Sequence, residues 1–193
     1  MIKLQKETFD EKQPLLTFAQ SGRCRVALYI GEEAAIVSTP TAEGSETEER
    51  TVYAYNVGWF AADGKITDEE EAVAALKAAK IAEIDTYDTS SAVNSFTLQG
   101  KQMWLPKETR VGLVNSITIE KAAGKETTVL WFDGEKYELP VDTALQMLSA
   151  LELYALDCYN VTAAHKAAVS AIDNVEEIIA YDITAGYPEK LNF

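Results

Sequence analysis

The chain of 193 residues is 47% hydrophobic, which is enough apolar surface to bury the core of one domain or of two small ones. With 17 basic and 31 acidic residues its formal net charge is -14, and both halves of the sequence are acidic. Neither half holds the cluster of lysine and arginine that binding to a nucleic acid or to an anionic membrane requires, so we expect neither partner.

The N-terminus and the cysteines indicate the cellular compartment. Residues 1–13 lack the apolar stretch of a signal peptide, so we expect the protein to stay in a cytoplasm or to be packaged from one. Cys24 and Cys158 both lie in apolar surroundings, which favours two buried free thiols. A disulfide between them is the alternative, which only geometry decides.

The first sixty residues predict an antiparallel β-meander. Residues 25–30 and 34–38 are apolar, strand-like segments on either side of a turn at residues 31–33, and residues 51–61 form a longer strand. The acidic segment 39–50 between the second and third of these strands predicts a solvated loop.

Alternation within the long strand places Tyr53, Tyr55 and Trp59 on one face. A row of exposed aromatic rings is typical of surfaces that stack on sugars, whereas aromatic residues in strands also commonly belong to the core. Both interpretations stay open at this point.

A helix follows over residues 68–87, with Thr67 and Glu70 as a predicted capping box, and it is expected to cover the meander. Residues 88–95 are rich in small polar residues and predict a linker. The predicted domains are therefore residues 1–90 and residues 91–193.

The second half begins with two hairpins separated by a helix. The first hairpin pairs residues 96–98 with 102–105. A helix then starts at Pro106 and stops at Gly124. The second hairpin pairs residues 127–132 with 136–139 about a primed turn at Asp133 and Gly134.

Residues 139–160 hold more apolar surface at helical spacing than any other segment and predict the core helix. Because only a narrow polar strip interrupts this surface, we expect the helix to be covered on most sides, by its own domain or by a neighbouring subunit. Thr162 predicts the start of a short helix to Ile172, and Asp173 the start of another that ends near Tyr181. The predicted fold class is α+β: a meander with one covering helix, then a ββαββααα unit with helices packed on a small antiparallel sheet.

The sequence contains no motif that indicates a reaction. His165 is the only histidine, and the sequence contains no C-x-x-C, H-E-x-x-H, phosphate-binding loop or nucleophile elbow. Carboxylate pairs such as Asp85 with Asp88, or Asp157 with Asp182, could serve as acid and base, but proximity of some pair is expected among 31 acidic residues. We therefore expect no catalytic residue, no metal site and no cofactor.

From Ala92 onward the chain resembles an uncharacterised domain of unknown function found in phage tail-fibre-type proteins and in prophage proteins of gut bacteria. The motifs that carry the resemblance are Val93-Asn94-Ser95-Phe96, Met103-Trp104-Leu105, Thr109-Arg110-Val111-Gly112-Leu113-Val114-Asn115-Ser116, Leu130-Trp131, Leu151-Glu152-Leu153-Tyr154-Ala155, His165-Lys166-Ala167-Ala168 and Tyr181-Asp182-Ile183-Thr184-Ala185-Gly186-Tyr187-Pro188. The resemblance covers residues 92–193. That family has no established catalytic residues, so none is carried over.

The resemblance implies a structural role in a virion or tail, located in the virion or in the cytoplasm of a bacterial host. Its partners would be other virion or tail proteins, and a homo-oligomer, a trimer by analogy with fibre symmetry, is expected. Because the sequence shows neither heptads nor β-helical repeats, we expect an adaptor, tip or assembly factor and not a fibre shaft.

Three functions therefore compete. The leading one is a non-enzymatic phage structural protein, with Tyr53, Tyr55, Trp59, Trp104 and Tyr187 as candidate interaction residues. The alternative is a carbohydrate- or receptor-binding module that uses the N-terminal aromatic residues on a glycan. The third is a small hydrolase that uses a pair of carboxylates.

Overall fold

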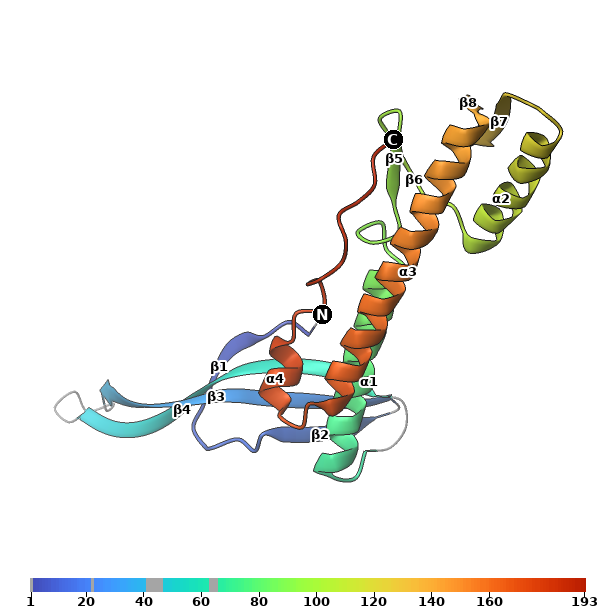
Figure 1. Cartoon of the computed structure of the whole chain (residues 1–193). Helices are drawn as coiled ribbons and strands as arrows, with labels where there is room; N and C mark the ends of the chain where they lie inside the picture. The colour runs from blue at the N-terminus through green and yellow to red at the C-terminus, as the bar shows by residue number, and fades with distance from the viewer. Residues whose placement is uncertain (1, 22, 41–46, 63–65) are drawn as a thin grey trace. The chain divides into compact units, whose positions relative to one another are not determined.

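The computed structural model describes residues 2–21, 23–40, 47–62 and 66–193 (Figure 1). The elements in chain order are β1 Gln5–Phe9, β2 Leu16–Ser21, β3 Arg23–Pro40, β4 Thr47–Ala62, α1 Glu69–Asp88, β5 Phe96–Leu98, β6 Lys101–Met103, α2 Lys107–Ala122, β7 Thr127–Phe132, β8 Glu135–Pro140, α3 Val141–Ala171 and α4 Val175–Ala180. A four-stranded antiparallel sheet is followed by helices that pack with two-stranded sheets, which confirms the predicted α+β class.

The chain forms two compact units. The first consists of Met1–Glu83 with Lys166–Asp182, and the second of Ile84–His165 with Ile183–Phe193. The predicted division at residue 90 assigns all of the later chain to the second domain, whereas α4 belongs to the first unit.

The sheet of the first unit has the strand order β1-β4-β3-β2, with every neighbouring pair antiparallel. Alternate side chains on one face, among them Val26, Leu28 and Phe60, pack against Leu76 of α1 and Ile178 of α4. Because one face of each strand is apolar at every second residue, the sheet needs this helical cover. The prediction that α1 covers the meander is confirmed.

The turn predicted at residues 31–33 is wrong, because β3 continues through it as one strand of 18 residues. Gly31 has a φ of 69°, and the register to β4 shifts between Ile30 and Glu33. A glycine at positive φ accommodates a β-bulge, which kinks a strand without ending it. Pairing then continues to Pro40 opposite Thr47, so residues 39–40 and 47–50 of the predicted acidic loop are strand, and its residues 41–46 lie outside the described part of the chain.

The start of α1 lies one residue later than predicted. The Asp68 carboxylate accepts a hydrogen bond from the Glu71 N–H at 2.8 Å, and the Glu71 carboxylate accepts from the N–H and the hydroxyl of Thr67, both at 2.8 Å. Asp68, and not Thr67, therefore caps the helix, which begins at Glu69, and the Glu71 side chain bonds back to Thr67, the residue before the cap.

Both predicted hairpins of the second unit are present. At the tip of β7 and β8, Asp133 and Gly134 have φ values of 49° and 81°, as a primed two-residue turn requires. Gly124 ends α2 as predicted: its N–H donates to the Lys121 carbonyl, while the Lys125 N–H donates to the Glu120 carbonyl.

The helix start predicted at Thr162 is wrong, because α3 runs unbroken over 31 residues. The Thr162 hydroxyl is 2.7 Å from the Asp88 carboxylate and 2.8 Å from the Tyr187 hydroxyl, so it serves tertiary contacts instead of a helix cap. The second half therefore reads ββαββαα. Asn174, and not Asp173, caps α4 by accepting from the Glu177 N–H at 3.0 Å.

The linker predicted at residues 88–95 is instead part of the second unit. Val93 and Ser95 are fully buried, and the Tyr154 hydroxyl of α3 donates to the Val93 carbonyl at 2.7 Å. The end of the chain lies against β5, where the Thr97 N–H donates to the Leu191 carbonyl and Phe193 donates back to Thr97. The core of this unit lies on the inner face of α3, around Leu148 and Leu151.

Candidate functional site

The outer face of α3 carries large apolar side chains that the second unit leaves uncovered. Leu153, Leu156 and Tyr159 are 64%, 53% and 68% exposed, at steps of three residues along the helix. The inner face of the same helix is buried, with Leu148 and Leu151 at zero exposure. The expectation that residues 139–160 are covered on most sides therefore holds for the inner face only.

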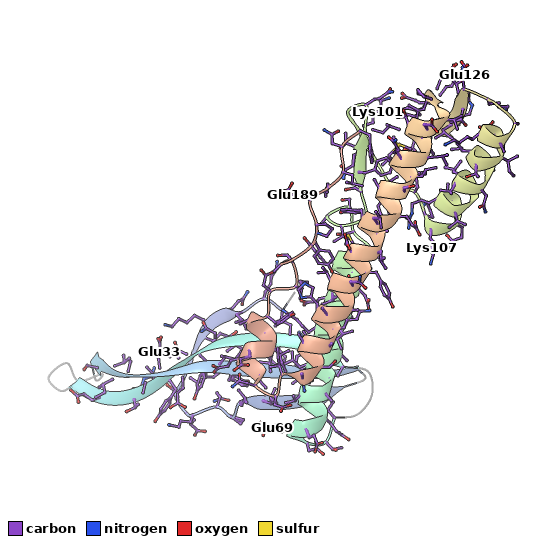
Figure 2. All side chains as sticks on the ribbon, in the orientation of Figure 1. Glu33, Glu69, Lys101, Lys107, Glu126 and Glu189 are labelled. Atoms are coloured by element: carbon purple, nitrogen blue, oxygen red, sulfur yellow. The ribbon has the colours of Figure 1, made fainter. Side chains whose placement is uncertain are left out.

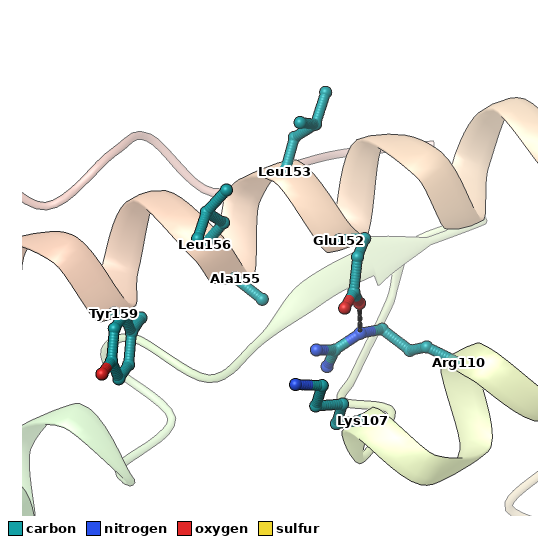
Figure 3. A pocket seen from close by; sticks show the side chains of 7 residues that line it. All are labelled: Lys107, Arg110, Glu152, Leu153, Ala155, Leu156 and Tyr159. Atoms are coloured by element: carbon teal, nitrogen blue, oxygen red, sulfur yellow. Dashed lines mark hydrogen bonds and ion pairs between the residues drawn. The ribbon is translucent and has the colours of Figure 1, made fainter.

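A groove of about 440 Å³ lies beside these residues, where α2 begins. Lys107 is the first residue of α2 (Figure 2). In Figure 3, Leu153 and Leu156 project away from α2, whereas Glu152 and Tyr159 point toward the side on which α2 lies. The groove therefore joins an apolar ridge to a charged edge.

Arg110 fixes that charged edge. Its side chain is buried, its Nε donates to the Glu152 carboxylate at 2.7 Å, and its Nη1 donates to the Leu105 carbonyl at 2.6 Å (Figure 3). The guanidinium also lies 5.1 Å from the centre of the Trp104 ring. Among the described residues Lys107 has no hydrogen-bond or ion-pair partner, so its ammonium group is available to a ligand or partner.

The candidate residues of the N-terminal sheet do not form a continuous aromatic row. Tyr55 is only 3% exposed, and its hydroxyl donates to Glu32 and accepts from the Gln13 N–H, both at 3.1 Å. Tyr53 is half-buried beside Lys12. Trp59 is 45% exposed, with the Arg25 guanidinium 5.2 Å from its ring centre, so it is the most accessible of the three rings.

The two candidates of the second unit are engaged within the fold. The Trp104 ring meets the Tyr154 ring edge-on, with the centroids 6.2 Å apart. The Tyr187 hydroxyl bonds to Thr162, and its ring meets Tyr87 edge-on at 5.4 Å. Burial raises the pKa of the Tyr187 phenol. Both residues stabilise the unit from inside.

The polar residues singled out for chemistry also have structural contacts. His165 Nε2 lies 2.8 Å from the Ala185 carbonyl, and its ring packs against Tyr187 at 5.7 Å. Burial raises the pKa of the Cys158 thiol, which is free and buried as predicted.

In the described part of the chain no group of three His, Cys, Asp or Glu side chains is placed to hold a metal ion, and no helix is long and apolar enough to cross a membrane.

The sequence did not single out Lys107, Arg110 or Tyr159 as site residues. The signal in the sequence that could have identified the site is the spacing of Leu153, Leu156 and Tyr159 at steps of three residues. This spacing places apolar side chains on the side of the helix that also holds its polar strip. A helix that is apolar on two sides buries one side and leaves the other for a partner.

Comparison with curated proteins and with solved structures finds no match. Residues 75–185 match a domain of unknown function, DUF4376. The match begins within α1, earlier than the resemblance noted from residue 92, and it includes α2 and the part of α3 that line the groove. Because the match spans more than half of the sequence, the chain belongs to the DUF4376 family.

Proposed function

We propose that this protein is a non-enzymatic structural protein that acts through protein–protein contacts, as an adaptor associated with the virion, tail or fibre of a phage or prophage. The observation that carries the proposal is the exposed apolar ridge of Leu153, Leu156 and Tyr159 beside the groove. Large apolar side chains that gather on one exposed face are typical of protein-interaction surfaces.

The surroundings of the ridge support a protein partner. Its apolar side chains adjoin the Arg110 and Glu152 ion pair and Lys107, which pairs with none of the residues that the structure describes, and this gives an apolar centre with a polar edge. Protein interfaces commonly have this arrangement, and a few residues near the centre, among which tyrosine is enriched, contribute most of the binding free energy. The phage setting rests on the sequence resemblance.

The proposal is tested by asking whether the protein is part of a phage particle. Particles purified from a phage-producing host that encodes the chain should contain it in a fixed ratio to a tail protein, measured by quantitative mass spectrometry. Leu156→Asp should lower that ratio at least tenfold, because an aspartate on the ridge would be buried without a partner. Ile119→Asp is the control: Ile119 is 70% exposed on α2 and does not line the groove. Particles that lack the wild-type chain would contradict the proposal.

A glycan-binding role is the second candidate, and the exposure of Trp59 favours it. An exposed indole ring with a neighbouring arginine is suited to stacking on a sugar. Trp59→Ala should then abolish binding on a glycan array while circular dichroism stays unchanged. An array on which the wild-type protein binds nothing would eliminate this candidate.

A further inference from the structure

The outer face of α3 carries a row of six side chains without charge. Positions separated by alternating steps of three and four residues lie along one side of a helix. In the second unit this row, which we call the seam, consists of Gln146, Ser149, Leu153, Leu156, Asn160 and Ala163, all of them exposed. A quarter of the residues of the whole chain are charged, whereas none of these six exposed positions is.

The order of these side chains is nearly the same from either end. The two leucines form the centre, and an antiparallel copy of the helix would place Leu153 opposite Leu156. The same alignment places Ser149 opposite Asn160, which pairs a hydroxyl with an amide, and Gln146 opposite Ala163. At the four inner positions, therefore, leucine meets leucine and each polar side chain meets a hydrogen-bonding partner, whereas the outer Gln146 meets only the methyl group of Ala163.

The charges beside the seam are also self-complementary. Lys107 and Glu152 both line the groove on the α2 side of α3 (Figure 3). In an antiparallel pair of helices the same flank of each helix meets its equivalent on the other helix, so Lys107 of one copy would approach Glu152 of the other. This contact occurs twice across a two-fold axis, and the seam itself adds no repulsion between two chains of charge -14.

We propose that the seam is the contact surface for a second copy of this chain, with the α3 helices antiparallel about a two-fold axis between Leu153 and Leu156. This inference rests on the proposed function, since it assigns a partner to the same apolar ridge. A helix of an unrelated protein would meet the leucines equally well, but nothing would require its polar order to mirror the seam. The mirrored order is therefore the observation that favours a second copy.

The mass of the full-length protein in solution is the first test. Light scattering across a dilution series should give twice the monomer mass of 21.2 kDa at high concentration. Leu153→Asp should raise the dimer dissociation constant at least tenfold, and Ile119→Asp should leave it unchanged. A monomer at every concentration, a trimer, or a dimer unaffected by Leu153→Asp would overturn the proposal.

Disulfide cross-linking tests the direction of the helices. A mixture of Ser149→Cys and Asn160→Cys proteins should form the mixed 149–160 disulfide, identified by peptide mass spectrometry. Each variant alone should cross-link poorly, because equivalent positions would be separated along the axis by about 16 Å, from eleven residues at 1.5 Å each, and a disulfide requires Cα atoms within about 7 Å. Efficient 149–149 cross-links would indicate parallel helices and overturn the arrangement.

The failure of this inference is distinguishable from that of the proposed function. A monomer that still enters phage particles, and loses entry on Leu156→Asp, would overturn the dimer and leave the adaptor role standing. A dimer of the expected geometry that is absent from phage particles would overturn the adaptor role and leave the dimer standing.

Discussion

Replacing Leu151 by alanine tests the placement of the core. Leu151 has zero exposure on the inner face of α3, and truncation removes about three methylene equivalents, or roughly 2.4 kcal/mol of transfer free energy at ~0.8 kcal/mol each. The cavity that remains adds to this cost, so we expect the free energy of unfolding to fall by about 2–5 kcal/mol. Urea unfolding followed by circular dichroism at low protein concentration measures the change.

Leu153→Ala is the matched control, two residues away on the same helix. Because Leu153 is 64% exposed, truncation removes little buried apolar area, and we expect the free energy of unfolding of the monomer to fall by less than about 1 kcal/mol. A loss below about 1 kcal/mol for Leu151→Ala, or equal losses for both variants, would mean that the inner and outer faces of α3 have been assigned wrongly.

The remaining predictions concern ionisation, backbone conformation and a buried hydroxyl. Burial raises the pKa of the Tyr154 phenol, so the folded state favours the protonated form. The contribution of this phenol to the free energy of unfolding is fully present below about pH 10 and is lost as the pH rises further. Tyr154→Phe should therefore make the urea midpoint fall less steeply at alkaline pH. Gly112→Ala should stabilise α2 by about 0.5–1 kcal/mol because its added methyl meets open space, whereas Gly134→Ala, at a φ of 81°, should destabilise by about 1 kcal/mol or more; equal thermal midpoints would contradict this pair. Thr162→Val should cost about 1–3 kcal/mol and speed hydrogen exchange at Phe193, since the hydroxyl joins α3 to Asp88 and Tyr187; unchanged exchange would refute that link.

Local chemistry explains why several elements could be predicted from the sequence. Asp133 and Gly134 form a primed turn because few other residue pairs adopt two successive positive φ values. Gly124 ends α2 for the same reason, since a glycine accepts the left-handed conformation that closes a helix. Each of these signals depends only on residues next to one another in the chain.

The elements that were mispredicted depend on distant residues. Thr162 has the side chain of a helix cap, but its hydroxyl bonds to residues 74 and 25 positions away, and the helix passes through it. Gly31 suggested a turn, but continued pairing with β4 makes it a bulge. Residues 88–95 look like a linker by composition, but Tyr154 draws them into the second unit.

The candidate site was predictable in part. The sequence showed that Leu153 and Leu156 widen the apolar surface of the core helix, but not which side the domain would cover. That choice depends on where α2 and the hairpins pack, which is set by contacts between distant residues such as Arg110 and Glu152. The aromatic residues were singled out by type, and the structure uses Tyr55, Trp104 and Tyr187 mainly inside the fold.

The first unit is interrupted in the sequence by most of the second, and this affects how the chain folds during synthesis. Val175 and Ile178 complete the apolar cover of the sheet, yet a ribosome adds them only after it has made Ile84–His165. At about 5–20 residues per second those 82 residues take roughly 4–16 s, during which the sheet face around Val26 and Leu28 lacks α4. The nascent chain is therefore exposed to aggregation during this interval, and slower translation or a missing chaperone should lower the yield of folded protein.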